Sequence, residues 1–128
     1  MPAPKLVQTE FLIPIRRDSE MSDGGEHPAA AWEWLRERLW DEFGGATKAP
    51  GLYEGFYRDP DTGGQVDDES RKYMVALPKS RLKALRHLLE DACLFFQQKC
   101  IYLNVAGQVE FVELHKAARH ESKKRHSS

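Results

Sequence analysis

Hydrophobic and polar residues alternate along this chain with two different periods, and the period changes several times. In Lys5–Ile15 one alternating set of positions is mostly apolar, which is typical of a half-buried strand. In Pro28–Phe43 apolar residues recur at spacings of three and four, which predicts an amphipathic helix that begins at proline and ends before two glycines. Alternation returns in Gly51–Asp59 and Arg71–Leu77, so these stretches predict an antiparallel hairpin around a turn-rich segment, residues 60–70.

The second half of the chain repeats the change from helix to strand. Ser80 is a suitable N-cap for a helix that runs to about Phe96. Ile101–Val105 predicts a fourth strand, and Val109–Leu114 predicts a short further strand. The order β-α-β-β-α-β predicts an α+β fold of the ferredoxin-like type. Its four-stranded antiparallel sheet would carry both helices on one face and leave room for a short fifth strand.

The apolar stripes of the two helices are expected to cover one face of the sheet. On the helices these stripes comprise Trp32, Leu35, Leu39 and Phe43, then Leu82, Leu85, Leu88, Leu89, Ala92, Cys93, Phe95 and Phe96. The inward side chains of the sheet are expected to be Val7, Phe11, Ile13, Tyr73, Val75, Leu77, Ile101, Leu103 and Val105.

The other face of the predicted sheet is unusually rich in apolar and aromatic side chains for a surface that two helices leave open. We expect it to display Leu12, Tyr53, Tyr57, Met74 and Tyr102. These residues are candidates for a homodimer interface, or for a ligand cleft roofed by a second subunit. Shielding by loops or by the last strand is the alternative.

Length and charge place limits on the classes of protein to consider. The 128 residues favour one domain, residues 1–114, followed by a basic tail, residues 115–128, that we expect to be disordered. The net charge is -1, and the tail holds five basic residues against one acidic residue, so the body is acidic and nucleic acid is not favoured as a partner. No apolar run approaches the ~20 residues of a membrane span, and the N-terminus lacks a signal core, so we expect a cytoplasmic protein.

A polar cluster is predicted near the hairpin. It consists of Glu54, Arg58, Asp59 and Arg71 and lies near Tyr57. A carboxylate beside a tyrosine is able to transfer protons. Cross-strand ion pairs of Glu54 or Asp59 with Arg71 are the favoured interpretation, because such pairs are the commoner role of these residues.

Other catalytic and metal-binding patterns do not match. Asp59–Ser70 resembles a calcium loop, but Ser70 stands where the bidentate glutamate belongs, so we predict no metal site. None of the five histidines has a catalytic context, and no phosphate-binding or nucleophile motif occurs. Cys93 and Cys100 are expected on the apolar side of the second helix, a poor setting for a reactive thiolate. We assign no catalytic residue and no cofactor, and a non-enzyme is favoured.

Several stretches together carry a resemblance. They are Phe11-Leu12-Ile13-Pro14-Ile15, Phe43-Gly44-Gly45, Gly51–Asp61 and Cys100-Ile101-Tyr102-Leu103. In these the chain resembles a loose group of short, functionally unassigned bacterial proteins with a ferredoxin-like core. The resemblance implies the fold and no catalytic residue.

The sequence thus favours a small cytoplasmic protein that dimerises through its open sheet face and serves as an interaction or regulatory module, with a further protein partner as an option. The alternative is a small cofactor-free enzyme or ligand-binding protein of the dimeric α/β-barrel type, with a pocket between sheet and helices. An RNA-binding sheet is disfavoured, because the aromatic RNP signature is missing.

Overall fold

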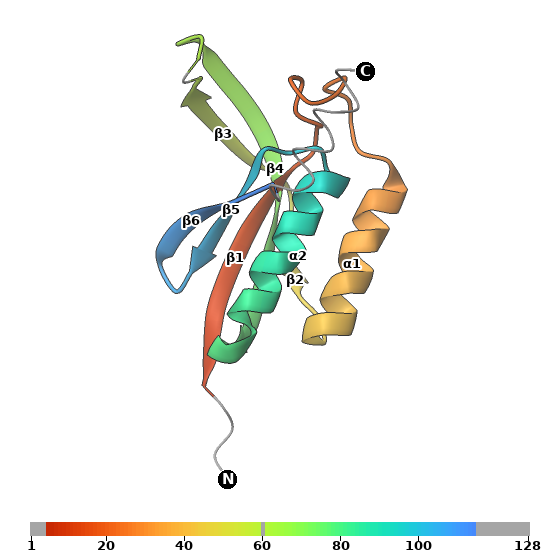
Figure 1. Ribbon diagram of the computed structural model, residues 1–128, viewed down its shortest axis with the longest axis vertical. Coiled ribbons are helices and arrows are strands. Elements are labelled where there is room, and N and C mark those ends of the chain that lie inside the picture. The colour runs from red at the N-terminus through yellow and green to blue at the C-terminus, as the bar shows by residue number, and fades with distance from the viewer. Residues whose placement is uncertain (1–4, 60, 115–128) are drawn as a thin grey trace.

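A computed structural model describes residues 5–59 and 61–114. Two helices lie against an antiparallel sheet of six strands (Figure 1), which confirms the α+β class. The elements in chain order are β1 (Leu6–Pro14), α1 (Ala29–Phe43), β2 (Thr47–Lys48), β3 (Tyr53–Arg58), β4 (Gln65–Pro78), the short 3-10 helix η1 (Lys79–Arg81), α2 (Leu82–Phe95), β5 (Cys100–Val105) and β6 (Gln108–Glu113).

The strands follow the order β2-β4-β1-β5-β6, and β3 also pairs with β4. The predicted sheet of four strands is therefore too small. The two residues of β2 are too few to produce a sequence pattern, whereas β6 forms close to the short strand expected at Val109–Leu114. All of the strand pairs are antiparallel, so the main chain closes its hydrogen bonds between neighbouring strands.

The core lies between the helices and one face of the sheet. Both helices cover this same face (Figure 1), as the two apolar stripes predict. Most of the expected inward strand residues are buried, namely Phe11, Ile13, Tyr73, Val75, Leu77, Ile101 and Leu103, while Val7 and Val105 are half-buried. The rings of Phe11 and Tyr73 stack with their centroids 5.4 Å apart, which ties β1 to β4 within the core.

The helix ends agree only in part with the sequence. Pro28 precedes α1, and Gly44 ends it with a φ of 76°, a left-handed conformation that favours glycine. Ser80 does not cap α2, because it lies inside η1, and Arg81 occupies the cap position without a capping hydrogen bond from its side chain. The 3-10 turn brings the chain from β4 into the helix in place of a capping side chain.

Two residues that were expected on the apolar side of the second helix, Phe95 and Cys100, lie elsewhere. Phe95 is 49% exposed, and its ring stacks on Trp34 at a centroid distance of 4.0 Å, whereas its neighbour Phe96 is fully buried. Cys100 is exposed at the start of β5 and is not part of the helix, while Cys93 is buried in α2 as expected. The helix ends at Phe95, so the residues after it no longer follow the helical spacing that the prediction assumed.

The predicted hairpin has a much shorter turn than residues 60–70. β4 begins at Gln65 and pairs with all of β3. Its first residues alternate in burial but not in polarity, because the more buried positions include the polar Asp68 and Ser70, so the sequence there resembles a loop. Asp59 closes the turn, since its Oδ1 accepts a hydrogen bond of 2.8 Å from the backbone N–H of Asp61.

Among the described helices, none is both long and apolar enough to cross a membrane. The basic tail predicted at residues 115–128 lies outside the described residues. The single domain expected for residues 1–114 stays a prediction.

A cavity-creating substitution tests this core. Leu89→Ala in α2 removes a fully buried side chain and should lower the free energy of unfolding by about 2–5 kcal/mol. Leu94→Ala, in the same helix but 46% exposed, is the matched control and should cost less than about 1 kcal/mol. Urea denaturation measures both, and equal losses would contradict the packing.

Candidate functional site

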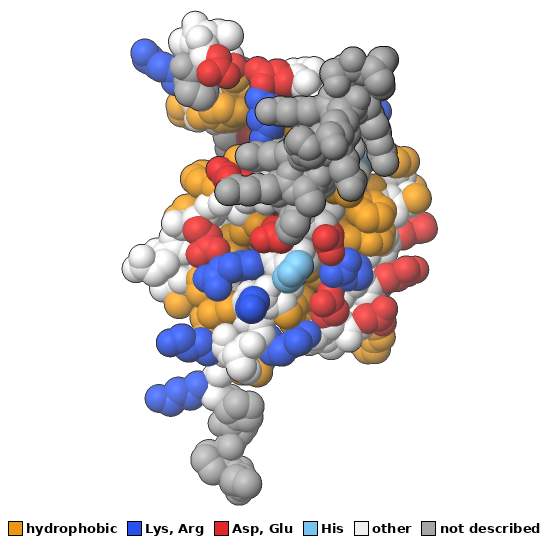
Figure 2. Space-filling model, viewed as in Figure 1, with side chains coloured by type: hydrophobic (Ala, Val, Ile, Leu, Met, Phe, Trp, Pro, Cys, Tyr) orange, Lys and Arg blue, Asp and Glu red, His pale blue; other side chains and the backbone are white. Residues whose placement is uncertain are grey.

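The β3–β4 hairpin extends beyond the rest of the sheet (Figure 1). β1 pairs with β4 only from Ser70 onward, where Pro14 is its last paired residue. Before Ser70, β4 continues with β3 as its paired strand. We call β3 together with Gln65–Ser70 the arm. Figure 2 shows hydrophobic side chains next to carboxylates on this projecting part of the molecule.

Two exposed tyrosines point to one face of the arm. Tyr53, Gly55 and Tyr57 occupy alternate positions of β3, so they share a face. Tyr53 pairs with Ser70 and Gly55 with Asp68, which places them opposite the buried set that includes Tyr73. This is the sheet face turned away from the helices, and Tyr53 and Tyr57 are 41% and 53% exposed there.

A carboxylate fills the space between the two tyrosine positions. A side-chain Cβ at Gly55 would lie 2.7 Å from Oδ1 of Asp68, so the carboxylate rests directly against the glycine. Within residues 5–59 and 61–114, no hydrogen bond or ion pair engages this carboxylate. Burial, followed by the charge of Asp67, raises the pKa of Asp68. We call Tyr53, Gly55, Tyr57 and Asp68 the arm cradle.

The Tyr57 hydroxyl lies in an acidic environment. Burial is the main cause that raises the pKa of Tyr57, and the charges of Asp68, Asp18 and Asp59 raise it further. Asp18 belongs to the loop between β1 and α1, far from the arm in sequence. The loop and the arm therefore contribute negative charge to the same place.

The remaining predicted interface residues continue the face from the arm across the sheet. Leu12 pairs in register with Lys72 on one side and Tyr102 on the other. Lys72 forms an ion pair with Glu10, and its ammonium lies 5.1 Å from the centre of the Tyr53 ring. The predicted residues Leu12, Tyr53, Tyr57, Met74 and Tyr102 thus share one face, and their role as an interface stays a prediction.

The predicted polar cluster is not brought together. Arg71 points to the helix side, where its guanidinium lies 3.9 Å from the centre of the Trp32 ring. Glu54 pairs in register with Glu69, and Asp59 serves the turn. In the described part of the chain, no ion pair joins Arg71 to Glu54 or Asp59. Glu54 faces the same side of the sheet as Arg71, but the Arg71 guanidinium lies over the Trp32 ring, which provides a cation–π partner.

Arg58 lies at the far end of the arm, opposite Gln65. In the described ranges 5–59 and 61–114, no three His, Cys, Asp or Glu side chains gather closely enough to hold a metal ion.

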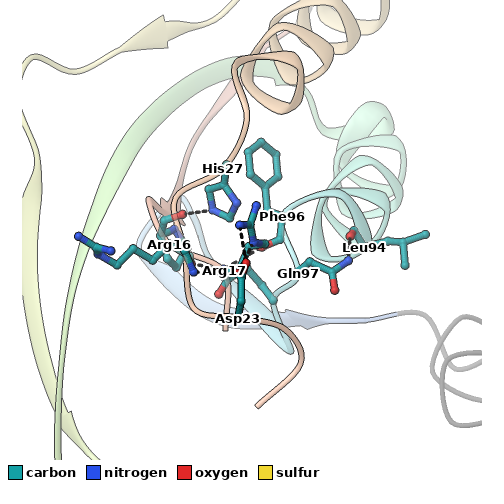
Figure 3. A network of polar contacts seen from close by, with 10 residues as sticks. Arg16, Arg17, Asp23, His27, Leu94, Phe96 and Gln97 are labelled. Carbon is teal, nitrogen blue, oxygen red and sulfur yellow. Dashed lines mark hydrogen bonds and ion pairs between the residues drawn. The ribbon is translucent and has the colours of Figure 1, made fainter. Parts of the chain in front are cut away.

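A histidine that sequence reasoning did not select lies at a junction of several elements. His27 is 8% exposed, and its Nε2 lies 2.7 Å from the carbonyl oxygen of Pro14. Figure 3 shows its ring between the segment of Arg16 and Arg17 and the ring of Phe96. Its edge contacts with Trp32 and Phe96 have centroid distances of 5.5 and 4.9 Å. No motif marks His27, because these partners come from separate parts of the chain.

The loop between β1 and α1 is held to the body by specific bonds. The Gln98 amide donates to the Arg16 carbonyl at 2.8 Å, and the Asp18 N–H donates to the Gln97 carbonyl at 2.9 Å. Within the loop, Arg17 and Asp23 form an ion pair with an N–O distance of 2.8 Å (Figure 3). These bonds dock the loop on the α2–β5 connection.

Comparisons with known proteins give a fold likeness and no family. No protein-family model matches the chain, and no curated protein matches it. A solved structure of a phage SAM lyase in complex with S-methyl-5'-thioadenosine is similar, with a TM-score of 0.64, 12% identity, and coverage of 88% of this chain and 93% of that one. The same comparison with a phage SAM lyase in the apo state gives 0.60, 12%, 85% and 90%.

This likeness corrects the expected function. An interaction or regulatory module was the favoured interpretation, but the similar structures are those of an enzyme, one of them with a bound small molecule. The alternative, a small enzyme or ligand-binding protein, is better supported. The layer between sheet and helices is filled by buried side chains such as Phe11, Leu35, Leu88 and Phe96. The described residues therefore leave no room for the pocket that was predicted there.

The arm cradle makes a prediction about Tyr57. Asp68→Asn removes the nearest negative charge, so it should lower the pKa of Tyr57 toward its ordinary value. Tyrosine labelled with carbon-13 at Cζ measures the titration of all four tyrosines by NMR. Asp67→Asn is the control on the neighbouring residue of the same strand, and a shift as large in this variant would contradict the cradle geometry.

Proposed function

We propose that this chain binds a small nucleoside ligand with a positively charged sulfonium centre, of the S-adenosylmethionine type, and acts on it as a small enzyme. The observation that carries this proposal is the partly buried Asp68 carboxylate, without a hydrogen-bond or ion-pair partner in the described part of the chain, between two exposed tyrosines. A carboxylate in this setting has lost part of its hydration and gains most from a cationic partner. The fold likeness to the phage SAM lyase supports the same class of ligand.

The charge of the arm supports a cationic ligand. From Tyr53 to Ser70 the sequence contains six acidic residues and one basic residue, Arg58. A surface with one sign of charge raises the local concentration of oppositely charged ligands and speeds their association. Because these groups are largely exposed, the effect should weaken as the salt concentration rises.

The two tyrosine rings suit the two recognisable parts of such a ligand, its sulfonium cation and its adenine ring. An aromatic ring attracts a cation over its face, a contact worth about 0.5–2 kcal/mol. Ring faces also stack on flat heterocycles such as adenine. Since Gly55 has no side chain, the Asp68 carboxylate lies between the positions of Tyr53 and Tyr57. The Lys72 ammonium already lies near the Tyr53 ring, so Tyr57, which is 53% exposed, is the ring proposed for the cation and Tyr53 the ring proposed for the heterocycle.

The chemistry of the sulfonium assigns a binding role to Asp68. In the proposed step the ligand's own carboxylate oxygen bonds to the aminobutyryl carbon next to sulfur, and the bond from that carbon to sulfur breaks. The electron pair of the broken bond stays on sulfur, so the charged sulfonium becomes the neutral thioether S-methyl-5'-thioadenosine and the aminobutyryl part leaves as a lactone. The attraction to Asp68 is then lost. A group that stabilises the charged ground state improves substrate binding and product release, but it does not lower the barrier to bond cleavage.

We also propose that the core of the fold follows the ferredoxin-like plan. In support, the neighbours β3-β4-β1-β5 take the order of that plan, and α1 and α2 connect them on one face. On this interpretation β2 and β6 are additions at the two edges.

A second copy of the chain is the proposed cover for the outer sheet face. In support, Tyr53, Tyr57 and Phe111 are exposed on this face. Exposed apolar surface of this kind is typical of an interface. A homodimer built in this way would place a second subunit above the arm cradle.

Ligand binding is tested with S-adenosylmethionine and S-methyl-5'-thioadenosine by isothermal titration. The wild type should bind the charged compound more tightly. Asp68→Asn should weaken that binding by about tenfold, equivalent to 1.4 kcal/mol, and should change binding of the neutral thioether much less. Asp67→Asn is the matched control, since it removes the same charge from the other face of β4.

Product formation is followed by chromatography of S-adenosylmethionine incubated with the wild type. Release of S-methyl-5'-thioadenosine above the spontaneous rate supports the enzymatic part of the proposal. Absence of binding and of product would overturn the proposal. Equal losses in the two aspartate variants would move the site away from the arm cradle.

The dimer is tested by sedimentation equilibrium. Met74→Glu buries an unpaired charge in the proposed interface, so association should weaken by several kcal/mol while the core stays folded. A wild type that stays monomeric at tens of micromolar, where a dimer needs about 7 kcal/mol of association energy, would rule out this interface.

A further inference from the structure

The environment of His27 is unusual for an ionisable side chain. The residue is 8% exposed, at the point where the loop after β1 passes into α1. Its ring is enclosed by the edges of Trp32 from α1 and Phe96 from the end of α2. Three separate segments therefore meet on one imidazole.

The hydrogen bonds of His27 fix its protonation state. Nε2 lies 2.7 Å from the Pro14 carbonyl oxygen, which can only accept, so Nε2 carries a proton and donates it. In the neutral ring Nδ1 is then a bare acceptor, and this buried atom has no hydrogen-bond partner among residues 5–59 and 61–114. A second proton, on Nδ1, would find no hydrogen-bond acceptor at this position. The protonated ring would then be a buried charge whose lost hydration nothing replaces.

The charges that face the ring oppose a second proton. Arg17 from the loop and Arg71 from β4 are the charged groups that act on it, and both are positive. Asp23 pairs with Arg17, while Arg71 lies over the ring of Trp32. From α1 and α2 the contacts are aromatic and uncharged. Burial is the main cause that lowers the pKa of His27, and the two arginines lower it further.

We propose that His27 is a protonation-sensitive latch for the loop between β1 and α1. In its neutral form the imidazole ties the end of the loop to Pro14 and fills the space between Trp32 and Phe96. Once protonated, it is stable only where water or an anion reaches Nδ1, so the ring leaves its site and the loop loosens from the body.

The latch is connected to the arm cradle through Asp18. This residue lies in the same loop, its N–H donates to the Gln97 carbonyl at 2.9 Å, and its charge acts on Tyr57. Opening the loop would therefore change the charge around Tyr57. The link to ligand binding depends on the proposed function, but the latch itself does not.

The direction of the pH dependence follows from linkage. A released imidazole takes up a proton near its ordinary pKa of 6.5, whereas the latched ring does so only at lower pH. The closed loop is therefore fully favoured above pH 6.5 and loses favour as the pH falls below this value. The ratio of open to closed loop should rise by up to about tenfold for each pH unit in this window.

Hydrogen exchange of the ligand-free full chain tests the latch. Protection factors, corrected for the intrinsic pH dependence of exchange, are measured from about pH 8 to about pH 5.5. In the wild type, protection of residues 16–27 should fall at the acid end while the amides of α2 stay protected. His27→Gln, which keeps a neutral donor, should remove this dependence, and His87→Gln, at a histidine 65% exposed, should keep it.

NMR of the His27 ring keeps the test independent of the variants. Wild-type spectra should show the Nε2–H tautomer and a pKa below the ordinary value. Three results would each overturn the proposal: loop protection that does not change with pH, loss of protection in α2 to the same degree, or an unchanged pH dependence in His27→Gln. Since no ligand is present, failure of the proposed function would leave this result standing.

Discussion

The length of β4 determines both the core and the exposed arm. The strand has 14 residues, and its longer second part, Ser70–Pro78, pairs with β1, where alternate side chains enter the core. Its shorter first part continues past the end of β1 with β3 as its paired strand. The same alternation that buries Tyr73 and Val75 on one face turns Asp68 to the other. A one-residue slip in the pairing with β1 would therefore exchange the core-facing and the outward-facing side chains along all of β4.

The loop between β1 and α1 links the core to this arm. At one end Pro14 closes the pairing with Ser70, and its carbonyl accepts the hydrogen bond of His27. Further along, Asp18 contributes charge to the surroundings of Tyr57. Ordering a loop of this length costs conformational entropy. Bonds such as that from the Gln98 amide to the Arg16 carbonyl offset this cost. The loop and the arm thus meet electrostatically at Tyr57.

Residues with a clear period were predictable, and residues defined by a distant partner were not. The spacing of Trp32, Leu35 and Leu39 and the alternation of Phe11 and Ile13 allowed the helices and the core face to be predicted, because one side of each element is buried. The sequence predicts a turn-rich segment where β4 begins, since polar residues occupy both faces there, including the half-buried Asp68 and the buried Ser70.

The candidate site was predictable to a similar extent. The shared face of Tyr53 and Tyr57 follows from period two, but the carboxylate of Asp68 against Gly55 depends on the register of two strands. The contact of Arg71 with Trp32 and that of His27 with Pro14 join residues whose separation in sequence gives no local signal. A position of this kind can be recognised only once the chain is folded.

In a chain of this size, a ligand site on the surface costs less stability than a pocket within the core. The layer between sheet and helices is packed with fully buried side chains, including Phe11, Leu35, Leu89 and Phe96, and a short chain has little apolar surface to spare. Opening a ligand pocket there would remove contacts worth several kcal/mol from a marginal total. The arm avoids this conflict, because its residues contribute little to the core and Asp68 and the tyrosines can be arranged for a ligand. Binding on such an open surface is weak until something excludes water, so a second subunit over the outer sheet face would complete the site without any change to the core.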